Sequence, residues 1–211
     1  MKKSGYESES LFNITTKPLL IVLSGPSGAG KDSVLTRMKE LDIPLEFIVT
    51  VTTRPRRPNE RDNIDYHFIS EASFQKMLQK KELLEWANVY GNWYGVPKQS
   101  VKQALDRGQD TIIKVDIQGA TTIKKILPQA VFIFLIPPSM PELITRLRQR
   151  NTESKTDFEL RLKTAEQEIK KLPMFDYAVV NQQEQIDNVV SDIRAIITAE
   201  KLRLTPKEYN L

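Results

Sequence analysis

A glycine-rich loop between a short apolar run and a helical pattern constrains this chain more than any other feature. The run Leu19–Leu23 is continuous and apolar, as in strands buried on both faces of a parallel sheet. The loop Gly25-Pro26-Ser27-Gly28-Ala29-Gly30-Lys31 has the spacing Gly-x4-Gly-Lys, and the helical pattern Ser33–Leu41 follows it. In this context the backbone amides and the helix N-terminus surround phosphate oxygens, and the lysine adds a positive charge. The sequence therefore predicts a phosphate-binding loop rather than a plain glycine-rich turn.

Further apolar runs alternate with helical patterns along the chain. The runs are Thr111–Val115, Val131–Ile136 and Ala178–Val180. The helical patterns are Lys98–Arg107, Pro141–Arg150, Phe158–Leu172 and Ile186–Leu204. Strand alternating with helix is typical of a parallel sheet with right-handed helical crossovers. We therefore expect an α/β protein with a P-loop NTPase core, in which helices flank a parallel sheet.

Residues 46–97 break this alternation. Strand patterns cover Phe47–Thr53 and Tyr66–Ile69, a helical pattern covers Phe74–Leu84, and the rest is rich in turn residues. This segment predicts a small α+β insertion on the core. A second insertion, opened by two prolines and rich in arginine, is expected at residues 137–164.

The expected organisation is therefore a core interrupted twice. The core would comprise residues 18–50, 98–136 and 165–205, with an α+β insertion at 51–97, a helical lid at 137–164, a flexible N-terminal tail at 1–17 and a C-terminal tail at 206–211.

Composition excludes several classes of protein. The absence of cysteine excludes disulfides and thiolate metal sites, and a single histidine argues against a zinc centre. The longest apolar run, Ala130–Ile136, is far shorter than the roughly 20 residues that a membrane span needs. The net charge of +4 is too small to indicate nucleic-acid binding, and no secretion signal opens the chain. We expect a cytoplasmic protein without a membrane or nucleic-acid partner.

An arginine cluster lies at residues 54–61, where four of eight residues are arginine and two are proline. Guanidinium groups donate paired hydrogen bonds to phosphate oxygens, so the cluster is suited to a small phosphate group. A solvated basic loop is the alternative, and the cluster alone does not decide between them.

Taken together, these motifs make the chain similar to guanylate kinases from about Leu19 to Arg203. The matching stretches are Ser24–Lys31, Thr52–Arg57, Asp65–Tyr66, Leu84–Ala87, Gly91–Gly95, Asp116–Gly119 and Val180–Asn181. The resemblance implies transfer of the γ-phosphoryl group of ATP to GMP, and also to dGMP, with Mg²⁺ as cofactor. It further implies a role in purine nucleotide metabolism and GMP recycling, a GMP-binding function for the 51–97 insertion, and a monomer or homodimer.

The resemblance also implies roles for particular residues. The expected ATP-binding residues are Gly25, Pro26, Ser27, Gly28, Ala29, Gly30, Lys31, Asp32, Ser33 and Asn181. The expected GMP-binding residues are Thr50, Arg54, Arg57, Tyr66, Glu85, Tyr94 and Asp116, and the expected catalytic residues are Lys31, Arg54, Arg146, Arg150 and Arg161. Glu85 and Asp116 would accept hydrogen bonds from guanine N1–H and N2–H, which adenine cannot offer.

Three positions depart from the family pattern. Asp32 replaces the usual hydroxyl residue after the lysine, Lys114 replaces an acid that many members carry, and Val96 replaces a hydroxyl residue expected to contact guanine. The last change removes one hydrogen bond, worth about 0.5–1.5 kcal/mol, so a somewhat raised KM for GMP is expected without loss of specificity.

Two of these departures suggest a compensating pair. Our hypothesis is that Asp32 coordinates Mg²⁺ directly or through one water, and that Lys114 pairs with Asp32 when the metal is absent. The alternative is that Asp32 only stabilises the N-terminus of the following helix.

Two other functions remain open from sequence alone. An inactive scaffold could use the arginine cluster to bind phosphopeptides or partner proteins, although such a scaffold would not need the intact loop. A kinase for a phosphorylated sugar would keep the loop but would not need Glu85 and Asp116. Trp86, Trp93 and His67 are expected to be structural.

Overall fold

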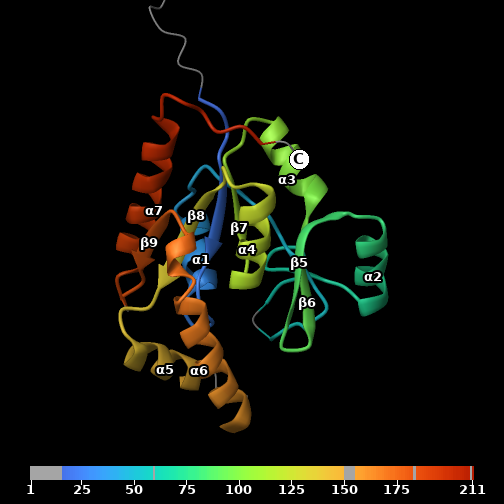
Figure 1. The fold of residues 1–211 in the computed structure, drawn as a ribbon, viewed down its shortest axis with the longest axis vertical. Helices are drawn as coiled ribbons and strands as arrows, with labels where there is room; N and C mark the ends of the chain where they lie inside the picture. Colours follow the sequence, from blue (N-terminus) through green and yellow to red (C-terminus); the bar gives the residue numbers. More distant parts are fainter. Residues whose placement is uncertain (1–15, 59, 150–154, 183, 210) are drawn as a thin grey trace, which may run out of the picture.

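Two β-sheets organise the chain (Figure 1). The computed structural model describes residues 16–58, 60–149, 155–182, 184–209 and 211. Most of the expected N-terminal tail and the expected catalytic residue Arg150 therefore lie outside the described residues.

The larger sheet has five parallel strands in the order β2-β7-β1-β8-β9. Its strands are β1 (Leu20–Ser24), β2 (Glu46–Phe47), β7 (Thr111–Lys114), β8 (Val131–Ile136) and β9 (Tyr177–Val180). The central strand β1 is completely buried, as its unbroken apolar sequence predicts. The predicted α/β class with a helix-flanked parallel sheet is confirmed.

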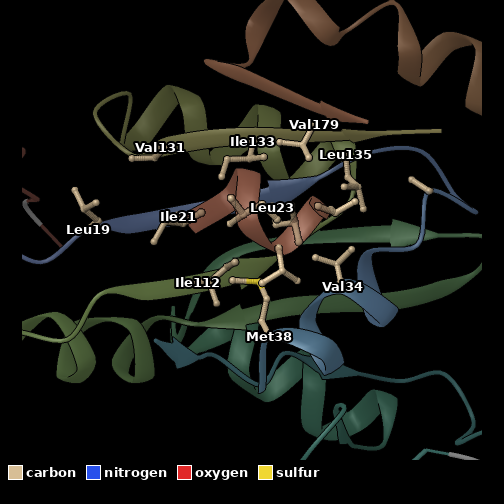
Figure 2. Packing of buried hydrophobic residues seen from close by; sticks show 14 residues of the cluster. Leu19, Ile21, Leu23, Val34, Met38, Ile112, Val131, Ile133, Leu135 and Val179 are labelled. Carbon is tan, nitrogen blue, oxygen red and sulfur yellow. The ribbon is translucent and has the colours of Figure 1, made fainter. Parts of the chain in front are cut away.

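Helices cover both faces of this sheet and bury two apolar clusters. On one face Ile21 and Leu23 pack with residues of α1 (Lys31–Glu40) and α7 (Ile186–Lys201), as Figure 2 shows in part. On the other face Leu20 and Val22 pack with α3 (Lys98–Asp106) and α4 (Ile117–Ile126). Because successive strand side chains point to opposite faces, β1 contributes to both clusters. It is thereby fixed rigidly beneath the loop that follows it.

The smaller sheet has four strands in the order β4-β3-β6-β5 and lies beside the core together with α2 (Figure 1). The elements are β3 (Val51–Thr52), β4 (His67–Phe68), α2 (Glu71–Gln79), β5 (Leu83–Val89) and β6 (Asn92–Pro97). Strands β5 and β6 form a hairpin whose turn residues, Tyr90 and Gly91, have φ values of 50° and 81°. Two positive φ values in a two-residue turn match the twist of an antiparallel hairpin.

The structure corrects two sequence predictions in this region. The single strand expected at Phe47–Thr53 is instead two strands, because residues 46–47 pair with β7 and residues 51–52 pair in the smaller sheet. The helix expected at Phe74–Leu84 ends at Gln79, where Lys81 adopts a φ of 55° and the chain turns into β5. The predictions failed because the choice of sheet depends on long-range pairing that propensity does not encode.

Two helices, α5 (Met140–Gln149) and α6 (Lys155–Ile169), form the end of the molecule at the bottom of Figure 1. They pack through Leu143, Leu147 and Ala165. Helix α6 is continuous across residues 164 and 165, where the lid was expected to end. A 3-10 turn, Leu172–Met174, then leads to β9.

The remaining structural predictions concern packing and the chain end. Trp86 and Trp93 pack edge to face with ring centroids 5.5 Å apart, and the His67 ring hydrogen-bonds Asn63 at 2.6 Å. The hydroxyl of Tyr209 accepts a hydrogen bond from the amide of Leu20 at 3.0 Å, so the C-terminal segment contacts the core. In the part of the chain that the structure describes, no helix has the length and apolar character to cross a membrane.

Candidate active site

A cleft of about 200 Å³ lies between the carboxyl ends of β1 and β7, the smaller sheet and helix α6. Ligands of open α/β sheets bind at this end of the strands. Many of the expected site residues line it, namely Gly25, Ser27, Gly28, Gly30, Lys31, Asp32, Thr50, Arg54, Arg57, Tyr66, Glu85, Tyr94, Asp116 and Arg161. The fold therefore brings residues from distant parts of the sequence to one place.

The glycine-rich loop has the backbone geometry that its sequence predicts. Gly28 and Gly30 have φ values of 85° and 90°, which side-chain-bearing residues rarely adopt. The ammonium group of Lys31 donates hydrogen bonds to the carbonyl oxygens of Gly25 and Pro26, at 2.6 and 3.1 Å. Burial lowers the pKa of Lys31, although the nearby carboxylates of Glu168 and Asp32 oppose the shift.

Asn181 and Arg146 support the loop from outside the cleft lining. The side-chain amide of Asn181 donates to the carbonyl of Ala29 at 2.7 Å, and its own backbone carbonyl accepts from Arg146 at 2.8 Å. Ser33 is exposed on α1 and, like Pro26, does not line the cleft.

Glu168 on α6 also contacts the loop, and no sequence motif singled it out. One of its carboxylate oxygens accepts a hydrogen bond from the Ser27 amide at 3.3 Å. Burial raises the pKa of Glu168, while the positive charge of Lys31 acts in the opposite direction. A carboxylate thus lies at an amide that a phosphate-binding loop would offer to a phosphate oxygen.

Arg54 is the most constrained residue of the arginine cluster. Its guanidinium donates to the Tyr94 hydroxyl at 3.2 Å, to the Glu60 carboxylate at 2.6 Å and to the Pro55 carbonyl at 2.7 Å. The same guanidinium lies 5.6 Å from the Tyr66 ring centroid. Because arginine has five N–H donors, it can hold these partners and still donate to a ligand.

Glu60 organises the cluster, although no sequence motif points to it. Its second carboxylate oxygen accepts a hydrogen bond from the Arg57 amide at 2.8 Å, while the first holds Arg54. Burial would raise the pKa of Glu60, but these hydrogen bonds outweigh burial and the net shift is downward. The sequence signal for this role is that Glu60 is the only acidic residue between positions 54 and 61.

Two acidic side chains, the buried Glu85 and the half-buried Asp116, line the cleft. Glu85 on β5 is 4% exposed, and one of its oxygens has no hydrogen-bond partner among the described residues. Burial, and then the charge of Asp116, raise the pKa of Glu85 to about 8. Burial also raises the pKa of Asp116, although one of its oxygens accepts a hydrogen bond from the Gly119 amide at 2.7 Å. This pair is suited to accept hydrogen bonds from a ligand.

The two departures at positions 32 and 114 meet in the cleft. The ammonium group of Lys114 forms an ion pair with the Asp32 carboxylate, as the hypothesis of a compensating pair predicts. Val96, by contrast, is fully buried in the apolar cluster that Leu20 and Val22 form with α3 and α4, and it does not line the cleft.

The lid residue Arg161 reaches the tip of the hairpin. Its guanidinium lies 5.2 Å from the ring centroid of Tyr90. Among the described residues no three acidic or histidine side chains gather as a metal site.

A parallel sheet with a lysine-containing phosphate loop at its carboxyl edge, facing an arginine cluster across a cleft, defines a P-loop phosphotransferase. The guanylate kinase family model matches residues 17–200, and the chain belongs to that family. It is therefore an ATP:GMP phosphotransferase that transfers a phosphoryl group from ATP to GMP.

Individual relatives agree with this assignment. The chain is 42% identical to a guanylate kinase of Carboxydothermus hydrogenoformans over 92% of this chain and 93% of the relative. It is 44% identical to that of Desulfitobacterium hafniense, over 90% and 94%. The crystal structure of guanylate kinase from Anaplasma phagocytophilum superimposes with a TM-score of 0.73 at 32% identity, covering 90% of this chain and 89% of that one.

Proposed function

We propose that the two sides of the cleft divide the substrates, with ATP on the phosphate loop and GMP on the smaller sheet. The observation that supports this proposal is that the loop lysine, the arginine cluster and the carboxylates of Glu85 and Asp116 line one cleft. A phosphopeptide-binding scaffold would not need the loop, and a sugar-phosphate kinase would not need the carboxylates.

On the donor side, the loop amides and Lys31 bind the β- and γ-phosphates of ATP. Nucleotide binding would exchange the contacts of Lys31 with Gly25 and Pro26 for contacts with phosphate oxygens. Glu168 would leave the Ser27 amide at the same time, because its carboxylate repels phosphate. Asn181 keeps the loop in place through its hydrogen bond to Ala29.

On the acceptor side, Arg54, Arg57, Tyr66 and Tyr94 hold the phosphate of GMP, and Thr50 lies at the same wall of the cleft. Glu85 and Asp116 then accept hydrogen bonds from guanine N1–H and N2–H. AMP lacks the guanine donors and would leave these acceptors unpaired. A site built to bind a substrate's hydrogen-bond donors rejects an analogue without them by roughly 10⁴–10⁵-fold. No covalent intermediate is needed, because an oxygen of the GMP phosphate attacks the γ-phosphorus directly.

Mg²⁺ is proposed as cofactor, and when bound it would neutralise charge on the transferring phosphoryl group. Asp32 is the residue that would hold it, because its carboxylate lines the cleft directly after Lys31 and carboxylate oxygens suit Mg²⁺. Calorimetric titration of Mg²⁺ with ATP onto the protein should give weaker binding for Asp32→Ala, which removes every side-chain oxygen at this position. Unchanged affinity for Mg²⁺ with ATP would show that Asp32 does not bind the metal and only stabilises the N-terminus of α1.

Closure of the 51–97 and 137–164 segments is proposed to complete the site and exclude water. Arg146, Arg150 and Arg161 would then supply positive charge to the transferring group. Water exclusion matters because an open site would allow ATP to be hydrolysed without transfer to GMP.

Four further properties are finer than the assignment to the family. The acceptor residues are assigned to the phosphate and the base, which GMP and dGMP share, so we propose that both are substrates. A cytoplasmic location, a role in GMP recycling and a monomeric or homodimeric state remain predictions from sequence.

The test is a coupled assay of ADP formation with GMP, AMP, CMP or UMP as acceptor. ADP should form with Mg²⁺, ATP and GMP, and far more slowly with the other acceptors. Arg54→Ala and Arg57→Ala should each raise the KM for GMP strongly and leave ATP binding nearly unchanged. Equal damage to ATP binding would place the arginine cluster on the donor side.

A further inference from the structure

Lys114 is the last residue of β7, the strand that pairs with β1 directly beneath the phosphate loop. Its side chain reaches into the cleft, where it is only 13% exposed. A lysine here is unexpected on electrostatic grounds, because its positive charge lines the same cleft as that of the loop lysine, Lys31. A second buried cation beside the loop lysine therefore needs a reason.

The neighbours of Lys114 place it between the two substrate sites. On the donor side its ammonium group pairs with Asp32, the residue after the loop lysine. On the acceptor side the same nitrogen lies 4.1 Å from the ring centroid of Tyr66, which in turn stands edge to face with Tyr94. Lys114 thus contacts one residue from each side of the cleft.

We propose that Lys114 is a phosphate-binding residue of the reaction centre, whose ammonium group contacts the acceptor phosphate on the side that faces the phosphate loop. This inference rests on the proposed function, because it assumes that the GMP phosphate lies beside Tyr66 and Arg54. Asp32 holds the long side chain of Lys114 in the cleft before the substrate arrives.

The chemistry of the reaction explains why a cation at this point is useful. Two anionic phosphate groups must approach each other before transfer, and positioned cations between them lower that repulsion. Arg54 is already held by Glu60 and Tyr94 at the far side of the acceptor phosphate. Lysine presents three donors on a flexible stem, so it can turn from Asp32 to a phosphate oxygen without movement of the backbone.

The chain offers a matched control for Lys114. Lys124 also forms an ion pair with an aspartate, Asp176, at 2.7 Å, and its ammonium group also lies 4.2 Å from an aromatic ring centroid, that of Phe132. Lys124 does not line the cleft. Replacement of either lysine by methionine therefore removes the same kinds of contact, but only Lys114 is positioned to meet a substrate.

The experiment measures calorimetric affinities for GMP, guanosine and ATP, each alone and without Mg²⁺. Lys114→Met should weaken GMP binding about 10-fold or more, because hydrogen bonds to charged groups are the stronger class, and should change guanosine binding less than about 2-fold. Lys124→Met should leave all three affinities unchanged, and Lys114→Arg should retain most of the GMP affinity. Melting temperatures confirm that each variant is folded, and Lys114→Gln replaces Lys114→Met if the latter is not.

Three results would overturn the proposal. Unchanged GMP binding in Lys114→Met would leave Lys114 as the structural partner of Asp32. Equal losses for GMP and guanosine would show that it acts on the shape of the site rather than on the phosphate. Equal losses in Lys114→Arg and Lys114→Met would show that its charge is not used.

Arg54→Ala separates this inference from the proposed function. If Arg54→Ala weakens GMP binding and Lys114→Met does not, only the role of Lys114 fails. If neither substitution weakens it, the proposed position of the acceptor phosphate is wrong, and the inference fails with it.

Discussion

The two sides of the cleft are built in different ways. The donor side is a continuous segment, Gly25–Lys31, in which backbone amides and glycine conformations form most of the site. The acceptor side consists of side chains from separate strands and loops, for example Arg54, Glu85 and Tyr94, which meet only in the folded chain. A local backbone site can be recognised from seven residues, whereas a site of dispersed side chains depends on every element that carries them.

This difference also separates how the two sides respond to substitution. In the proposed arrangement, donor-side residues act on the phosphates that react, so their loss should reduce the rate of transfer. Acceptor-side residues would orient GMP, and some are held by neighbours such as Glu60 and Gly119, so their loss should reduce affinity and selectivity.

The largest effect is expected for Lys31→Met. The substitution removes the positive charge next to the transferring phosphoryl group, so kcat should fall by roughly 10³-fold while calorimetric GMP affinity remains near that of the native protein. A comparable loss of GMP affinity would show that the two sides of the cleft do not act separately.

Glu60→Gln should have the next largest effect, on GMP only. The carboxylate fixes the guanidinium of Arg54 and the backbone of Arg57, so its loss should raise the KM for GMP by about 10–100-fold with little change in the KM for ATP. Glu40→Gln is the control, because Glu40 pairs with Arg37 on the exposed side of α1. Equal behaviour of the two variants would remove Glu60 from the acceptor site.

Gly119→Ala should separate affinity from stability. A Cβ atom at Gly119 would lie 2.6 Å from a Glu85 carboxylate oxygen, so Glu85 must move and GMP affinity should fall about 10-fold. Alanine favours the helix more than glycine does, and residue 119 lies inside α4. The melting temperature should therefore not fall, whereas general disruption of the core would lower it.

The control for this prediction is Gln118→Ala on the exposed side of the same helix, which should change neither quantity. A lower melting temperature with unchanged GMP affinity in Gly119→Ala would show that the glycine is needed for packing alone.

The smallest effect concerns pH. The folded state holds the pKa of Glu85 at about 8, above its ordinary value of 4.5, so the folded protein binds more protons than the unfolded chain between these values. The free energy of unfolding should therefore fall as pH rises through this window. Denaturant titrations of Glu85→Gln should show a weaker fall, and an identical pH profile would contradict the assignment.

The difference between the two sides explains what could be predicted from sequence. The central strand and the parallel sheet follow from local apolar runs, and they are confirmed. The phosphate-binding role of the loop follows from glycine spacing and stays a prediction. The hairpin of β5 and β6 was interpreted as turn-rich chain, because Gly91, Gly95 and Pro97 mask two strands that are stabilised by pairing with each other. Glu60 and Glu168 were missed because their contacts cross between segments that no motif links.

Family resemblance supplied most of the acceptor residues that physical reasoning could not find. Glu85 and Asp116 are ordinary acids in the sequence, and only the folded chain shows that they line one cleft and that a buried oxygen of Glu85 has no partner among the described residues. The pair of Asp32 and Lys114 was the exception, since it was inferred from two departures in charge and from the expected adjacency of two strands.

The central claim is that the smaller sheet selects guanine while the loop supplies the donor phosphates. The most direct test compares kcat/KM for GMP and AMP, at saturating ATP, in the native protein and in Glu85→Gln. We expect a preference for GMP of about 10⁴-fold or more in the native protein, and a preference at least about 10-fold smaller in the variant with the KM for ATP unchanged. Comparable use of AMP by the native protein, or an undiminished preference in Glu85→Gln, would contradict the account.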